Sequence, residues 1–354
     1  MSTEAEAEAG ATATPAPPAP PAAREFDDVV EESPDLLAIE PEERRALVIG
    51  EALVDVVRHA GRAVPDASIE DSEHPGGSPA NVALTLARLG RGVDLLTWFA
   101  RDRFGELLVR HLTASGLEIV PGSDGAERTS AAVARIADDG AATYDFDVTW
   151  QVPDSWTAPA AAPLVVHTGS IAAVLEPGGP DVARILAAHR ETATITYDPN
   201  VRPTLMPPAD DTRERVAALV ALADVVKVSD EDLDWLYPGA DVDASAQAWA
   251  ASGPAVVVVT RGSAGATAFT RNGTRVDVAA PRVRVADTVG AGDSFMGGLI
   301  DGLWSAHLLG PDRRDELAAC DDQALRDVLE RCVRIAAVTV SRPGADPPTA
   351  AELV

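Results

Sequence analysis

Four short, continuous apolar runs constrain the fold of this chain most strongly. They lie at residues 164–168, 193–197, 224–228 and 255–260. Helical segments are predicted between them, near residues 180–190, 212–222 and 244–251. Strands that are apolar on both faces belong in a sheet that helices cover on both sides. The pattern therefore predicts an α/β fold with a central, mostly parallel sheet.

Polar residues follow directly after these strands. They are Asp198, Asn200, Arg202, Ser229, Asp232, Thr260, Arg261 and Gly262. In open α/β sheets, ligands bind beyond the carboxyl ends of the strands. We therefore expect these side chains to surround a single site.

Residues 287–302 read as a glycine-bearing turn that leads into a helix. Gly290 and Gly292 allow a tight turn and a close ligand, and the N–H groups at a helix N-terminus bind phosphate. Asp293 would repel such a phosphate, so we expect it to act on the phosphate acceptor instead. As a general base it would take a proton from an attacking hydroxyl, while the amides of residues 290–293 stabilise the transferred group.

The N-terminal half predicts fewer and more polar elements. Residues 46–57 read as one buried strand that carries an acid, Asp55. A helix is predicted from Pro79, a strand over 93–98 and a helix over 103–115. Residues 129–150 alternate between polar and apolar side chains, which predicts a hairpin with its turn at 138–140.

Two long stretches resemble the signatures of the ribokinase/PfkB sugar-kinase family. Asp287-Thr-Val-Gly-Ala-Gly-Asp293 resembles the C-terminal signature, and Gly76-Gly-Ser-Pro-Ala-Asn-Val-Ala-Leu-Thr-Leu-Ala-Arg-Leu-Gly90 resembles the N-terminal one. Asp198-Pro-Asn-Val-Arg-Pro203, Lys227-Val-Ser-Asp-Glu-Asp-Leu233 and Ser341-Arg-Pro-Gly-Ala-Asp-Pro-Pro348 resemble the fructokinase branch. The resemblance covers residues 46–354, in the family's order.

The resemblance implies a ribokinase-like fold and a reaction. A small β-lid, built from about residues 54–68 and 129–150, would cover the sugar and exclude water. The reaction would be ATP-dependent phosphorylation of a sugar hydroxyl, with fructose to fructose 6-phosphate as the first expectation. A homodimer through the lid is a further expectation.

The resemblance, together with the residue types, assigns roles to the site. Asp293 is the expected base, with the anion hole at Gly290, Ala291 and Gly292. The expected substrate-binding residues are Asp55, Gly76, Gly77, Asn81 and Arg202. The expected nucleotide-binding residues are Lys227, Ser229, Thr260, Gly262, Gly265 and Cys332.

Several of these residues have a structural alternative. Asp55 could be a strand-end acid, Asn81 a turn or cap residue, and Arg202 a partner in a surface ion pair. Lys227 could pair with a nearby carboxylate, and Cys332 fits plain core packing.

The same resemblance implies bound metal ions. Asp232 is the candidate for Mg²⁺, although Ser229-Asp-Glu-Asp232 departs from the Asn-x-x-Glu motif of many relatives. Magnesium needs few protein ligands, because nucleotide phosphates and water can hold most of its coordination sphere. Asp287, with the loop that follows the last helix, is the candidate for a monovalent cation such as K⁺.

Composition excludes several classes of partner. The formal net charge is -27, and Lys227 is the only lysine, so the chain would repel nucleic acid and anionic membranes. Two cysteines form neither a disulfide framework nor a metal cluster. No signal-peptide pattern or long apolar run is present, which indicates a cytoplasmic protein.

Residues 1–45 are predicted to be a disordered tail, ahead of a kinase domain at 46–354. The tail is rich in Ala and Pro, and it carries twelve acidic residues against three arginines. Such a segment cannot bury enough apolar surface to offset the entropy lost on ordering.

Three other functions stay open. A 2-keto-3-deoxygluconate kinase would use a cation such as Arg202 for the substrate carboxylate. A nucleoside kinase would need aromatic stacking, and only 4% of this chain is aromatic. A non-catalytic sugar sensor could share the fold, because fold does not fix function.

Overall fold

The computed structural model describes residues 44–59, 72–136 and 142–353. Most of the predicted tail, residues 1–43, lies outside this range, as do the predicted turn at 138–140 and residues 60–68 of the predicted lid. Within the described residues, no helix is long and apolar enough to cross a bilayer.

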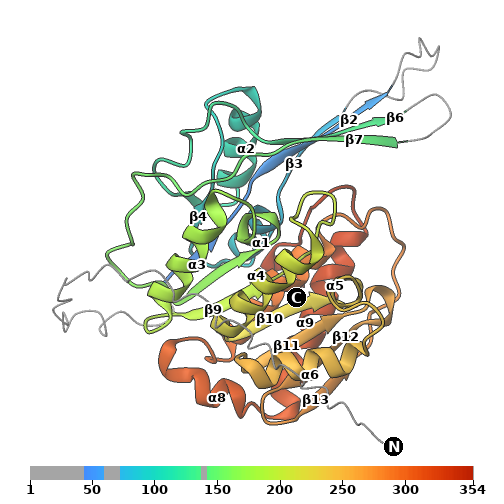
Figure 1. Ribbon diagram of the computed structural model, residues 1–354. Helices are drawn as coiled ribbons and strands as arrows, with labels where there is room; N and C mark the ends of the chain where they lie inside the picture. The colour runs from blue at the N-terminus through green and yellow to red at the C-terminus, as the bar shows by residue number, and fades with distance from the viewer. Residues whose placement is uncertain (1–43, 60–71, 137–141, 354) are drawn as a thin grey trace, which may run out of the picture. The chain divides into compact units, whose positions relative to one another are not determined.

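The described strands form a main sheet of nine strands, ordered β13-β12-β11-β10-β9-β8-β1-β4-β5 (Figure 1). In this order they span Arg275–Val278, Ala266–Thr270, Val256–Thr260, Val225–Ser229, Thr194–Asp198, Val165–Gly169, Ala46–Ile49, Val93–Leu96 and Glu118–Ile119. The seven strands from β11 to β5 run parallel. Strands β12 and β13 add an antiparallel edge that the sequence did not predict.

Helices cover both faces of this sheet. One face packs against α1 (Ser78–Arg88), α2 (Arg103–Thr113), α7 (Ala291–Ser305) and α9 (Asp322–Val340). The other packs against α3 (Gly178–His189), α4 (Ala209–Leu222), α5 (Asp230–Leu236) and α6 (Val242–Ser252). The short α8 spans Arg314–Ala318. Successive strand residues belong to opposite cores, as with Val48 and Ile49 of β1, which confirms the predicted doubly covered sheet.

A second sheet joins four strands in the order β3-β2-β6-β7. They are β3 (Ser72–Gly76), β2 (Leu53–His59), β6 (Ala131–Ile136) and β7 (Ala142–Asp147) (Figure 1). Strands β2 and β6 run parallel, whereas β3 and β7 are antiparallel to their neighbours. Strand β3 lies outside the ranges that the sequence suggested for a lid.

The prediction of one strand over residues 46–57 is wrong. The chain leaves the main sheet after Ile49 and enters the second sheet at Leu53. Gly50 has a φ of 153°, and a Cβ there would lie 2.3 Å from the ring of Pro79, so the backbone turns where only glycine fits. This break depends on contact with α1, which hydrophobic periodicity cannot detect.

Candidate active site

Helix α7 begins at a turn that leaves backbone N–H groups available. Its N-cap, Gly290, has a φ of 74°, and a Cβ there would lie 2.6 Å from the Cβ of Ala345. Among the described residues, the N–H groups of Gly292 and Asp293 have no hydrogen-bond acceptor. Such groups at a helix N-terminus favour a bound anion.

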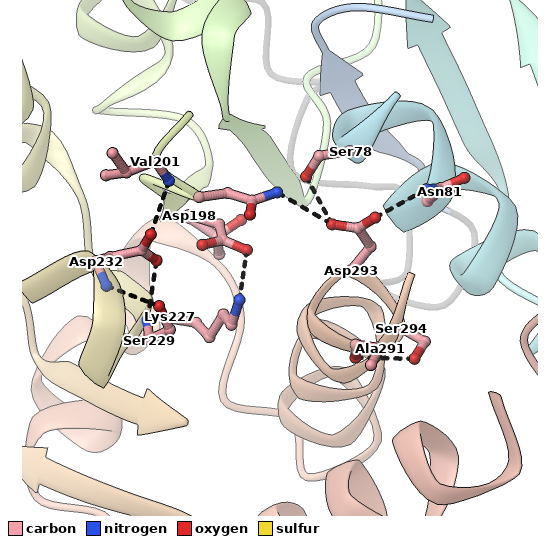
Figure 2. Close-up of polar contacts among 12 residues, drawn as sticks. Ser78, Asn81, Asp198, Val201, Lys227, Ser229, Asp232, Ala291, Asp293 and Ser294 are labelled. Atoms are coloured by element: carbon pink, nitrogen blue, oxygen red, sulfur yellow. Dashed lines mark hydrogen bonds and ion pairs between the residues drawn. The ribbon is translucent and has the colours of Figure 1, made fainter. Parts of the chain in front are cut away.

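Three side chains donate hydrogen bonds to Asp293, which is 7% exposed. Ser78 Oγ lies 2.7 Å and Asn200 Nδ2 3.3 Å from Oδ1. Asn81 Nδ2 lies 2.8 Å from Oδ2. Figure 2 shows the carboxylate at the N-terminal end of α7, next to Ser78 and Asn81 from the start of α1. The carboxylate is therefore held in one orientation at the mouth of the helix.

A cavity of about 300 Å³, called cavity A, lies on one side of this helix end. The residues that line it include Glu51, Asp55, Gly77, Ser78, Asn81, Asn200, Arg202 and Asp293. Gly76 does not line it, but a Cβ there would lie 2.4 Å from Oδ2 of Asp55, so this glycine leaves room for the carboxylate. Cavity A thus collects four of the five predicted substrate-binding residues.

A second cavity of about 650 Å³, called cavity B, lies on the other side. The residues that line it include Thr260, Gly262, Gly265, Val283, Val285, Phe295, Val333, Ala336, Ala337 and Val340. Thr288, Ala291 and Gly292 line both cavities. The free amides of α7 therefore lie where the two cavities meet.

A larger cavity of about 860 Å³ lies elsewhere, between α2 and residues 117–124. None of the predicted site residues lines it. Cavity volume alone would therefore select this cavity as the candidate site. The clustering of polar groups identifies cavities A and B instead.

Cys332 is one of three predicted nucleotide-binding residues that do not line cavity B. It is fully buried in the core of α1, α7 and α9, and it does not line cavity B. Val333, the residue after Cys332, lines the cavity together with Ala336 and Val340. Burial raises the pKa of the Cys332 thiol, as expected for a core cysteine.

Lys227, Ser229 and Asp232 also lie outside both cavities. Lys227 pairs with Asp198, the alternative that the sequence left open. Ser229 and Asp232 form a capping box at the start of α5, and Oδ1 of Asp232 accepts the N–H of Val201 at 2.9 Å. Both carboxylate oxygens of Asp232 are thus engaged with backbone, which does not fit a direct magnesium ligand. The described residues contain no cluster of three metal-ligating side chains.

Asp287 connects the loop before α7 with the loop after α9. Its Oδ1 accepts the N–H of Val289 at 3.0 Å, and its Oδ2 accepts the N–H of Gly344 at 2.8 Å. These backbone donors, Val289 first, lower the pKa of Asp287. The carboxylate is therefore anionic and lies against the predicted cation-binding loop.

Two carboxyl groups of cavity A have raised pKa values. Burial raises the pKa of Asp55 to about 6, against the lowering effect of His74 and Arg202. Burial likewise raises the pKa of Glu51 to about 7. Glu51 accepts the N–H of Ala172 at 3.1 Å. Glu51 was not predicted from the sequence, although an acid next to an apolar strand end is a signal for a functional carboxylate.

Arg202 lines cavity A and not cavity B. Its guanidinium donates to Oδ1 of Asn200 at 2.7 Å and to the carbonyl of Val201 at 3.0 Å. Asn200 itself has a φ of 37°, which is uncommon for a residue other than glycine. The sequence placed Asn200 near the site as a strand-end residue, but its bond to Asp293 depends on this backbone conformation.

The sequence matches the pfkB family carbohydrate kinase over residues 43–351. It is 32% identical to a fructokinase from Rhizobium leguminosarum bv. trifolii over 293 residues, which are 79% of this chain and 85% of that protein.

Two solved structures share the fold. A fructokinase from Xylella fastidiosa with bound ATP has a TM-score of 0.73 and 25% identity, covering 87% of this chain and 96% of that one. A fructokinase double mutant from Vibrio cholerae, bound to fructose, ADP and potassium, has a TM-score of 0.70 and 27% identity, covering 88% and 97%. The predicted ribokinase-like fold is confirmed, and the chain belongs to the pfkB family of carbohydrate kinases.

Proposed function

We propose that this carbohydrate kinase transfers the terminal phosphoryl group of ATP to a hydroxyl of fructose, giving fructose 6-phosphate. One observation carries the proposal: the amides at the start of α7 lie where cavities A and B meet, with Asp293 lining cavity A. A sugar in cavity A and a nucleotide in cavity B would bring acceptor and donor to the same helix end.

Asp293 is proposed as the general base. A hydroxyl in cavity A could donate its proton to the carboxylate that Ser78, Asn81 and Asn200 orient. The amides of Gly292 and Asp293 would stabilise the charge on the transferred phosphoryl group. Because the protein does little covalent work in phosphoryl transfer, orientation and charge account for most of the rate.

Cavity B suits an adenine base on its apolar side. Val283, Val285 and Ala337 offer apolar contacts there, while Thr260 and Gly262 lie at the end of β11. Magnesium would be held mainly by the nucleotide phosphates and water, which needs no dedicated cluster of carboxylates. Potassium would be held by Asp287 and the loop near Gly344.

Fructose is proposed from the relatives together with cavity A. The relatives named above are fructokinases. Asp55 and Asn81 line cavity A and can accept and donate hydrogen bonds to neutral hydroxyls. Asp55, whose pKa is about 6, is mostly ionised at neutral pH and would repel a substrate carboxylate.

One alternative substrate, 2-keto-3-deoxygluconate, has a specific observation in its favour. Arg202 lies in cavity A, where it could meet a carboxylate. The experiment is a competition between the two substrates at equal concentration with limiting ATP. A higher kcat/KM for fructose supports the proposal. A higher kcat/KM for the keto-acid, abolished by Arg202→Ala, would overturn it and leave the kinase class standing.

A further inference from the structure

Lys227 and Asp198 form a buried ion pair that cavities A and B do not explain. The ammonium lies 2.9 Å from Oδ2 of Asp198, and the two side chains are 3% and 0% exposed. Both project from the sheet face that packs against α7, since the alternate residues Val226 and Tyr197 belong to the opposite core. Burial of two charges is costly, and replacing them with neutral side chains is often neutral or stabilising. The pair therefore requires an explanation beyond stability.

The positive end of this pair faces the first turn of α7. A Cβ on Gly292 would lie 2.9 Å from Nζ of Lys227, and no atom of Asp198 lies within 4 Å of that position. Gly292 has no positive φ, so its lack of a side chain matters here because it lets the ammonium approach the helix. Figure 2 shows the lysine extending from its strand toward this region.

Lys227 carries its charge despite its burial. Burial lowers the pKa of the amine, but the carboxylates of Asp198, Asp232 and Asp293 together raise it above the ordinary value. A charge in a water-poor interior is weakly screened, so its field reaches the N–H groups of the adjoining turn.

We propose that Lys227 is a positioning residue for phosphoryl transfer, which acts from beneath the anion hole without touching the substrate. Its ammonium adds positive potential to the N-terminus of α7, where the amides of Gly292 and Asp293 receive the transferred group. Asp198 holds the ammonium in this direction. The inference rests on the proposed kinase function, and it replaces the direct nucleotide contact that was expected of Lys227 from the sequence.

Two single substitutions separate this role from a structural one. Lys227→Met removes the charge beneath the anion hole, whereas Asp198→Asn leaves the lysine in place with an acceptor for its ammonium, and the carboxylates of Asp232 and Asp293 still raise its pKa. Both break the same ion pair. We expect kcat to fall about 10–100-fold in Lys227→Met. The kcat of Asp198→Asn should be at least tenfold higher than that of Lys227→Met. The KM for sugar should change little in either variant. Equal losses of kcat in the two variants would overturn the proposal.

The double variant Lys227→Met/Asp198→Asn covers the case in which Lys227→Met does not fold. It leaves no unpaired buried charge, so its Tm should return toward the wild-type value while kcat stays low. Recovery of kcat along with Tm would mean that the pair is only structural.

Arg190→Met is the matched control. Arg190 pairs with Asp224, which is 1% exposed and directly precedes β10, at the opposite end of that strand from the site. This variant also strips a partner from a buried carboxylate, and Arg314 remains as the second partner. It should lower Tm without lowering kcat; a loss of kcat matching that of Lys227→Met would count against the proposal.

Nucleotide affinity separates failure of this inference from failure of the proposed function. Calorimetry with Mg·ATP and Mg·ADP in the absence of sugar needs no turnover. Lys227→Met should weaken ATP binding about tenfold and ADP binding less, because the ammonium lies beneath the position of the terminal phosphate. If wild-type protein phosphorylates no sugar, the proposed function fails; unchanged ATP affinity in the variant would separately sink the role of Lys227.

Discussion

Asp293→Asn tests the proposed base most directly, because asparagine keeps the shape of aspartate and cannot accept a proton at neutral pH. Loss of a general base lowers kcat about 10²–10⁴-fold, which corresponds to about 3–5 kcal/mol of transition-state free energy. The KM for sugar should change much less, because the other residues of cavity A remain. Steady-state kinetics with fructose and ATP measure both.

The substitution also disturbs the three hydrogen bonds that Asp293 accepts. If the amide oxygen keeps the bonds from Ser78 and Asn200, the amide nitrogen faces Nδ2 of Asn81, a second donor. One buried donor left without an acceptor costs about 1–3 kcal/mol. In a domain of this size, each kcal/mol lowers Tm by about 1–2 °C. A moderate fall in Tm is therefore expected along with the loss of kcat.

An exchange variant separates these two effects. In Asn81→Asp/Asp293→Asn the amide of residue 293 can donate to the new carboxylate, so most of the lost Tm should return. The base, however, now projects from α1 and not from α7. Turnover should stay at the level of Asp293→Asn. Wild-type turnover in Asp293→Asn would refute the role of Asp293 as base, and a full recovery of kcat in the exchange variant would refute its positional requirement.

Three further predictions concern stability, the tail and the cation. Glu51 has a pKa of about 7 in the folded protein, raised by burial above the ordinary value of 4.5, so its contribution to stability is complete below pH 4.5 and is lost as pH rises through 7. Glu51→Gln should therefore raise the free energy of unfolding by up to about 3 kcal/mol at pH 8.5 and have little effect at pH 4.5; denaturant unfolding across this range measures it, and a gain independent of pH would contradict the reasoning. Removal of residues 1–43 should leave Tm and turnover unchanged, because that acidic, Ala/Pro-rich segment has few large apolar residues with which to dock; a fall in either would contradict this. Replacement of potassium by a bulky organic cation at fixed magnesium and ionic strength should lower turnover, because Asp287 and the loop at Gly344 are proposed to bind the ion; unchanged turnover would remove the ion site.

The parts of the site that the sequence predicted well are local in the chain. The turn before α7, its glycines and Asp293 lie within a few residues of one another, so spacing alone relates the amides to the carboxylate. The strand ends were equally accessible, because parallel strands bring their carboxyl ends to one edge of the sheet. This explains why Asn200 and Arg202 were expected near the site.

The parts that the sequence missed depend on contacts between distant segments. The break between β1 and β2 follows from the approach of Gly50 to Pro79. A one-residue error on α9, from Val333 to Cys332, rotates a side chain by about 100° around the helix, which moves it from the cavity into the core. The resemblance selected Cys332, and only the packing of α9 in the core with α1 and α7 shows that its neighbour Val333 lines cavity B instead.

Gly292 was predicted to belong to the site, but the structure gives a different reason for a glycine at this position. The sequence suggested that this glycine lets a ligand approach the backbone. In the structure, the position that its Cβ would take lies 2.9 Å from the ammonium of Lys227, on the interior side of α7. The absence of a side chain therefore brings a buried charge under the turn, while the N–H of the same residue stays free of any acceptor among the described residues. Gly292 therefore has two effects at this helix end. Its missing side chain leaves room for the ammonium of Lys227, and its free N–H remains available to an anion where the two cavities meet.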